Sequence, residues 1–108
     1  RLFAIGQLDE SAISDALSWN DMVFVKLGLA LLTGISPAVV DDIIAAQSPK
    51  GVTSLAWRAG LSMRCAMQLQ SRAANIPPRM LLNARNGFDY PLTPVEMTWQ
   101  LEFYGAKL

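Results

Sequence analysis

Six cationic side chains in the middle of this chain are the residues best suited to bind a charged ligand. They are Lys50, Arg58, Arg64, Arg72, Arg79 and Arg85. No acidic residue lies between positions 43 and 88, although the formal net charge of the 108-residue chain is zero. Guanidinium groups bind carboxylates and phosphates through paired hydrogen bonds. These six residues are therefore the candidate site for an acidic protein segment, a nucleic-acid backbone or an anionic ligand.

The competing interpretation is that nearby acids fold back and pair with these cations. The flanking acids include Asp41, Asp42 and Glu96. We favour this pairing, because the spacing between successive arginines follows no single helical face.

Other reactive residues are few. Cys65 is the single cysteine, and the chain contains no histidine. A cysteine beside Arg64 in an amphipathic helix is most often a small buried apolar residue rather than a nucleophile. Asp41 and Asp42 are adjacent, so on a helix their side chains point about 100° apart and do not easily share a metal ion or a proton. We therefore expect no catalytic, metal or cofactor site, and no enzymatic activity.

Two similar tripeptides indicate how the chain is built. Gly34-Ile35-Ser36 and Gly60-Leu61-Ser62 each follow an apolar, helix-like stretch and precede another helix signal. Glycine can adopt the left-handed conformation that ends a helix, and serine can cap the next one. The sequence thus predicts an all-α chain of stacked helical hairpins.

Seven helices are expected from periodicity, caps and turn residues. The predicted ranges are Asp9 to Trp19, Asn20 or Asp21 to Leu32, Ser36 to a loop at 47–51, Val52 to Ala59, Ser62 to Asn75, a segment after Pro77-Pro78 that ends at Asn86-Gly87, and Leu92 to Tyr104. The second helix is apolar nearly all round, which predicts that it is central and buried.

The last of these segments has two readings. Alternation of apolar and polar residues from Val95 to Phe103 is typical of a half-buried strand. Thr93, Pro94 and Glu96 instead form the signature of a capped helix start. We favour a helix buried on two sides, and keep a strand that pairs with a second copy of the chain as the alternative.

The apolar content predicts both a core and an exposed face. Of the residues, 52% are hydrophobic and only 17% are charged. Trp19, Trp57 and Trp99 are expected in the core, since large aromatic side chains dominate core packing. The first residue is Arg1 rather than methionine, so we expect a fragment of a longer chain with an exposed apolar face on its N-terminal side.

A family resemblance supports this architecture. The relevant residues are Phe24, Leu29, Ala30, Leu32, Gly34 and Ile35, then the loop to Gly51, Leu55 and Ala59-Gly60-Leu61. This pattern, strongest over positions 20–62, resembles a bacterial family catalogued as domain of unknown function 2336. The resemblance implies a HEAT-like helical repeat and a longer parent protein, and it implies no catalytic residue.

We therefore expect a single helical-repeat domain over residues 1–108, a HEAT-like α-solenoid fragment of about seven helices. The expected function is that of a protein–protein interaction or scaffold module with an unidentified protein partner. A homodimer formed through apolar faces is kept as an alternative to that partner. The alternative is nucleic-acid or anionic-ligand binding through residues 50–85. No apolar run is long enough to span a membrane, and we expect a cytoplasmic protein.

Overall fold

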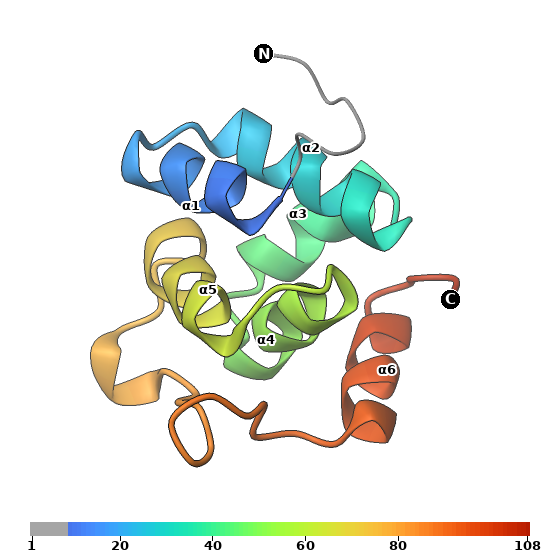
Figure 1. Cartoon of the computed structure of the whole chain (residues 1–108). Coiled ribbons are helices and arrows are strands. Elements are labelled where there is room, and N and C mark those ends of the chain that lie inside the picture. Colours follow the sequence, from blue (N-terminus) through green and yellow to red (C-terminus); the bar gives the residue numbers. More distant parts are fainter. Residues whose placement is uncertain (1–8) are drawn as a thin grey trace.

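The computed structural model describes residues 9–108. It contains six α-helices: α1 (Glu10–Ser18), α2 (Met22–Thr33), α3 (Pro37–Ala45), α4 (Pro49–Arg58), α5 (Met63–Gln68) and α6 (Pro94–Phe103) (Figure 1). A π-helical segment, η1 (Leu69–Ala73), continues α5, and a 3-10 turn, η2 (Pro78–Met80), follows it. No β-strand occurs within residues 9–108, where only an isolated bridge joins Arg85 to Asp89. The prediction of an all-α chain is confirmed.

A side-chain cap begins each of these α-helices. The capping residues are Asp9, Asp21, Ser36, Ser48, Ser62 and Thr93. The expected loop at 47–51 is wrong, because Ser48 caps α4 and Pro49 is its first residue. The hydroxyl of Ser48 accepts a hydrogen bond from the N–H of Gly51 at 3.1 Å. This serine–proline pair repeats the signal at Ser36-Pro37, where a helix start is confirmed.

The two glycine joints have the predicted geometry. Gly34 and Gly60 have φ angles of 75° and 77°, in the left-handed region that glycine adopts without steric cost. The apolar residue that follows each glycine, Ile35 or Leu61, is buried in the core. Each joint therefore turns the chain sharply and fixes the turn by burying a side chain.

Helix α4 lies at the centre of the molecule. It packs against α2, α3, α5, η1 and α6 (Figure 1). Leu55 and Ala56 on α4 are completely buried. Gly51, in the first turn of α4, allows Tyr104 at the end of α6 to approach closely, since a Cβ at this position would lie 3.1 Å from Cε2 of Tyr104. The described chain measures 33 × 28 × 23 Å along its principal axes.

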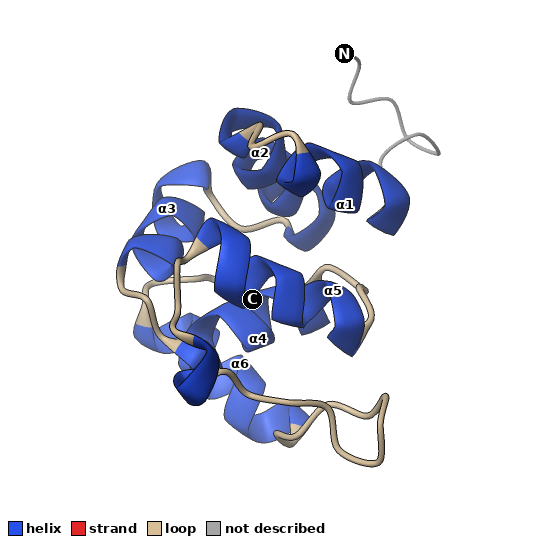
Figure 2. Ribbon diagram, turned by 90° about the vertical axis from the view of Figure 1, so that its left-hand side faces the viewer, coloured by secondary structure: helices blue, strands red, loops and turns tan. Residues whose placement is uncertain are grey.

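The predicted sixth helix, between Pro77-Pro78 and Asn86-Gly87, is wrong. Only the short turn η2 forms there, and a long connector then leads to α6 (Figure 2). The buried side chain of Gln70 explains the difference, because its amide donates to the carbonyl of Leu82 at 3.0 Å and accepts from the Leu82 N–H at 2.9 Å. With both backbone groups of Leu82 bound to Gln70, this residue cannot join a helical hydrogen-bond ladder.

The last segment is a helix, as favoured. Thr93 and Glu96 form the predicted capping box, and Pro94 occupies the first helical position. Only one side of α6 is buried, however, through Met97 and Leu101. The expectation of burial on two sides is wrong because α4 covers α6 from a single direction.

Helix α2 is also less buried than expected. Its core side carries Phe24, Val25 and Leu29, which are buried. Its other side leaves Val23, Leu27 and Leu31 exposed, because α1, α3 and α4 all approach the core side.

The tryptophan prediction is wrong for two of the three residues. Trp19 is 72% exposed and Trp99 is 58% exposed, while Trp57 is half-buried. Trp19 follows the last turn of α1, and Trp99 lies on α6 opposite its buried side.

Within the part of the chain that the structure describes, no single helix is long and apolar enough to cross a membrane. Helices α2 and α3 together would be long and apolar enough, but the pair is bent by 119° at the joint between them.

Candidate interaction surfaces

An apolar groove lies at the joint between α2 and α3. It has a volume of about 480 Å³ and is lined by Leu27, Ala30, Leu31, Gly34, Ile35, Ser36 and Pro37. On α2 the exposed residues Val23, Leu27 and Leu31 follow one another at intervals of four, which places them along one side of the helix. We call these three residues and the groove the α2 face. Its lining residues carry no charge.

One ion pair lies beside the α2 face. The Nζ atom of Lys26 on α2 is 2.6 Å from Oδ1 of Asp41 on α3, and both side chains are partly exposed. Lys26 is the only charged residue of α2. Its pairing with Asp41 leaves this helix without an unpaired charge, so the α2 face is electrically neutral as well as apolar.

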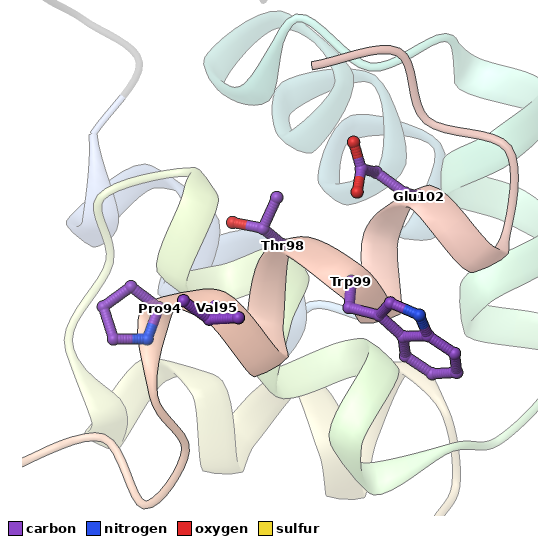
Figure 3. Close-up of a pocket in the computed structure, with 5 residues that line it drawn as sticks. All are labelled: Pro94, Val95, Thr98, Trp99 and Glu102. Atoms are coloured by element: carbon purple, nitrogen blue, oxygen red, sulfur yellow. The ribbon is translucent and has the colours of Figure 1, made fainter.

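A second exposed apolar stripe runs along α6. Its residues are Val95, Trp99 and Phe103, which are 79%, 58% and 67% exposed. A shallow hollow of about 360 Å³ lies on the same side of the helix and is lined by Pro94, Val95, Thr98, Trp99 and Glu102 (Figure 3). We call this stripe and hollow the α6 face. Glu102 contributes a carboxylate beside its apolar side chains.

The aromatic rings of α6 hold one another in place. The Trp99 and Phe103 rings stack with centroids 5.5 Å apart, and Phe103 meets the Tyr104 ring edge-on at 5.2 Å. Tyr104 is half-buried and lies against the position of Gly51 on α4. The exposed rings are thereby connected to the core through Tyr104, which restricts their motion before any ligand binds.

All six cations of the sequence prediction are exposed. They lie on different elements: Lys50 and Arg58 at opposite ends of α4, Arg64 on α5, Arg72 on η1, Arg79 on η2, and Arg85 in the connector that follows. Arg64 borders a polar cleft of about 270 Å³ together with Glu10 and Asp15. None of the other five cations lines that cleft.

The favoured pairing of these cations with flanking acids is wrong for residues 9–108. None of the six forms an ion pair within that range, and Asp41 pairs with Lys26 instead. Lys50 lies close enough to Glu96 to influence its charge without forming an ion pair. Hydrogen bonds from Thr93 lower the pKa of Glu96, and the positive charge of Lys50 lowers it further.

Cys65 is enclosed rather than activated. Its side chain is buried, and burial raises the pKa of its thiol to about 12, with a smaller contribution in the same direction from Glu10. Arg64 opposes this rise only in part. A thiol in such surroundings stays protonated, whereas nucleophilic cysteines have a lowered pKa. Residues 9–108 contain no group of three or more His, Cys, Asp or Glu side chains placed to hold a metal ion.

The sequence predicts an exposed apolar face but does not assign it to particular residues, although the signal of both faces is present. Val23, Leu27 and Leu31 repeat at four-residue intervals, as do Val95, Trp99 and Phe103. Each helix also carries a second apolar side, and periodicity alone does not show which of two apolar sides faces the core.

Comparison with known proteins shows one similarity. No curated protein and no solved structure matches the chain. The family model described as an uncharacterised protein conserved in bacteria (DUF2336) matches residues 1–79, which include α1 to α5, η1 and most of η2, whereas α6 lies beyond the match. The match extends the resemblance at positions 20–62 in both directions, and the chain belongs to the DUF2336 family.

Proposed function

We propose that this protein is a protein–protein interaction or scaffold module without enzymatic activity, and that its α2 face binds a second copy of the chain. The observation that carries the proposal is the α2 face itself. Val23, Leu27 and Leu31 are exposed on a rigid helix, next to an apolar groove of about 480 Å³. Exposed apolar surface of this kind marks interaction sites in soluble proteins.

The charges on α2 favour a second copy as the partner. If two α2 helices pair antiparallel about a two-fold axis at Leu27, Val23 of one copy meets Leu31 of the other. Lys26 of both copies then lies on the same flank of the interface. Because each Lys26 is already paired with its own Asp41, such an interface brings apolar surfaces together without opposing unpaired like charges.

The order of the helices supports a scaffold role. Neighbouring helices in the sequence pack on one another from α1 to α5. The joints at Gly34 and Gly60 repeat the same turn between successive hairpins. We propose that this arrangement is a short HEAT-like stack that also closes on itself, because α1 packs on α5, and that its outer surfaces stay free for partners.

Light scattering of the 108-residue chain over a concentration series tests the proposal. We expect a dimer that Leu31→Asp converts to a monomer, because a buried, unpaired carboxylate at an interface costs several kcal/mol. Val95→Asp is the matched control, since it places the same charge at an exposed apolar position on α6. A wild-type chain that stays monomeric, or a dimer that survives Leu31→Asp but not Val95→Asp, contradicts the proposal.

The six cations support a second candidate, the binding of nucleic acid or another anionic ligand. The supporting observation is that all six are exposed and none is paired with an acid within residues 9–108. Their distribution over α4, α5, η1, η2 and the following connector favours a long, flexible polyanion over a small ligand.

Fluorescence anisotropy of a labelled single-stranded oligonucleotide tests this second candidate. Binding through phosphates should weaken steeply with added salt. The slope of the logarithm of the binding constant against the logarithm of the salt concentration should become shallower by about one unit for each contacting cation removed. Arg72→Gln with Arg79→Gln should reduce this slope, whereas Lys26→Gln, which removes a cation paired with Asp41, should not. Absence of binding at low salt rejects this candidate.

A further inference from the structure

The α6 face has acidic side chains on both flanks of its apolar stripe. Successive residues of an α-helix are rotated by about 100°, so Val95, Trp99 and Phe103 form a band centred on Trp99. On the same basis, Glu96 and Glu102 lie about 60° to either side of Trp99, and the buried residues Met97 and Leu101 lie on the opposite side. Both carboxylates belong to exposed residues, and α6 contains no basic residue.

This charge pattern disfavours a second copy of the chain as the partner of α6. In an antiparallel pair with its two-fold axis at Trp99, Val95 of one copy meets Phe103 of the other, which suits the apolar stripe. Each flank of that interface, however, would carry two carboxylates, from Glu96 of both copies on one flank and from Glu102 of both copies on the other. Like charges opposed across an interface weaken it and exclude that partner.

The same pattern suits a partner with the opposite charge. Glu96 stays ionised because Thr93 and Lys50 lower its pKa. Glu102 and Trp99 both line the hollow, with their side chains pointing in different directions (Figure 3), so the hollow offers a partner's cations a carboxylate at one place and an aromatic ring at another. Tryptophan is among the residues that contribute most to binding at protein interfaces, and the stacking of Trp99 on Phe103 positions it in advance.

We propose that the α6 face binds an amphipathic helix of a partner protein whose apolar stripe is flanked by lysine or arginine residues. A helix fits because the α6 stripe is a straight apolar ridge about 12 Å long, or two helical turns, beside a hollow that receives a side chain. This surface is separate from the α2 face, so partner binding through α6 and pairing through α2 are independent.

The probe is a designed helical peptide of about 18 residues, with a leucine stripe flanked by lysines. A peptide of this length is long enough to form a helix when it is bound. Anisotropy of the labelled peptide measures its binding to the full 108-residue chain. We expect Trp99→Ala and Glu102→Lys each to weaken binding about tenfold or more, because each removes a contact worth roughly 1.4 kcal/mol or more. A peptide with glutamates in place of lysines should bind at least tenfold more weakly.

Two control variants test whether a loss of peptide binding is specific to the α6 face. Asp42→Lys makes the same charge change as Glu102→Lys at an exposed position on α3, and should leave peptide affinity unchanged. Leu31→Asp, which disrupts the α2 face, should bind the peptide as the wild type does. Circular dichroism should show the same helix content for Trp99→Ala, whose side chain is exposed.

Three results of the peptide-binding measurements overturn the proposal. These are no binding of the lysine peptide at millimolar concentration, equal binding of the lysine and glutamate peptides, and binding that Trp99→Ala leaves unchanged. A wild-type dimer that Trp99→Ala converts to a monomer would also overturn it, because the occupant of the α6 face would then be a second copy. A monomeric wild type that still binds the lysine peptide through Trp99 would contradict only the proposed pairing through α2.

Discussion

The carboxylate of Glu10 binds Ser62, the residue that caps helix α5 and lies 52 positions later in the chain. Its two oxygens accept hydrogen bonds from the N–H of Ser62 at 2.6 Å and from the hydroxyl of Ser62 at 2.7 Å. The same hydroxyl accepts a bond from the N–H of Cys65 in the first turn of α5. Glu10 therefore joins the beginning of α1 to the beginning of α5 and places a negative charge where a helix dipole is positive.

Replacing Glu10 with alanine should destabilise the fold. Loss of both bonds to Ser62 should lower the free energy of unfolding by about 1 kcal/mol, which is less than is typical of hydrogen bonds to a charged group because the site is exposed. Urea denaturation measures the change. Asp15→Ala is the matched control, since Asp15 is exposed on the same helix; equal effects of the two substitutions would show that the bonds to Ser62 contribute nothing.

Replacing Thr53 with valine should stabilise the fold. The hydroxyl of Thr53 is buried in α4 and has no hydrogen-bond partner, so its removal relieves the cost of a desolvated polar group, about 1 kcal/mol or more. Thr33→Val makes the same change where the buried hydroxyl donates to the carbonyl of Leu29 at 2.7 Å and accepts from the N–H of Ile35 at 3.1 Å. Thermal melts should move in opposite directions for the two variants, and a loss of stability in both would disprove the argument for Thr53.

Replacing Gly51 with alanine should loosen the contact between α4 and α6. The new Cβ would lie 3.1 Å from Cε2 of Tyr104 and 3.4 Å from Cγ2 of Ile43. Overpacking of this kind costs about 1–3 kcal/mol, which exceeds the gain of up to about 1 kcal/mol from replacing glycine within a helix.

A double-mutant cycle with Tyr104→Ala identifies the cause. Without the Tyr104 ring, Gly51→Ala should cost much less or become stabilising, since its closest contact is gone. If Gly51→Ala has the same effect with and without the ring, Tyr104 is not the cause.

The buried thiol of Cys65 should make stability fall at alkaline pH. Burial raises its pKa from an ordinary value of 9.0 to about 12, so above pH 9 the unfolded chain loses a proton that the folded chain keeps. This contribution is therefore complete below pH 9 and is lost as the pH rises toward 12. Urea denaturation at pH 8, 9 and 10 should show a decline that is shallower in Cys65→Ala. A decline of the same steepness in the variant would assign the effect to other groups, such as Tyr90, whose pKa burial also raises.

The same burial predicts slow thiol labelling. Cys65 in the folded chain should react with a maleimide far more slowly than in urea, because reagents attack the exposed thiolate. Equal rates in both conditions would mean that Cys65 is accessible in the native state.

Much of the fold could be predicted from local signals in the sequence. The joints at Gly34 and Gly60, and the helix starts at Ser36 and Thr93, depend on residues within one turn of each other. The helix start at Ser48 has the same serine–proline signal and could have been found by the same rule.

Other features depend on contacts between distant residues. The bonds from Gln70 to Leu82 prevent a helix that local composition favours, and no neighbouring residue reveals them. The exposure of Trp99 likewise depends on which side of α6 meets α4, since both sides are apolar. Both apolar faces proposed as interaction surfaces belong to this second group, and local sequence therefore did not identify them.

Light scattering at low and high salt is the decisive test of an apolar interface on α2. We expect a dimer whose dissociation constant changes little with salt and which Leu31→Asp converts to a monomer, because burial of apolar surface is not screened by ions. A monomer at every concentration and salt, or a dimer that dissociates as salt is added, would contradict it.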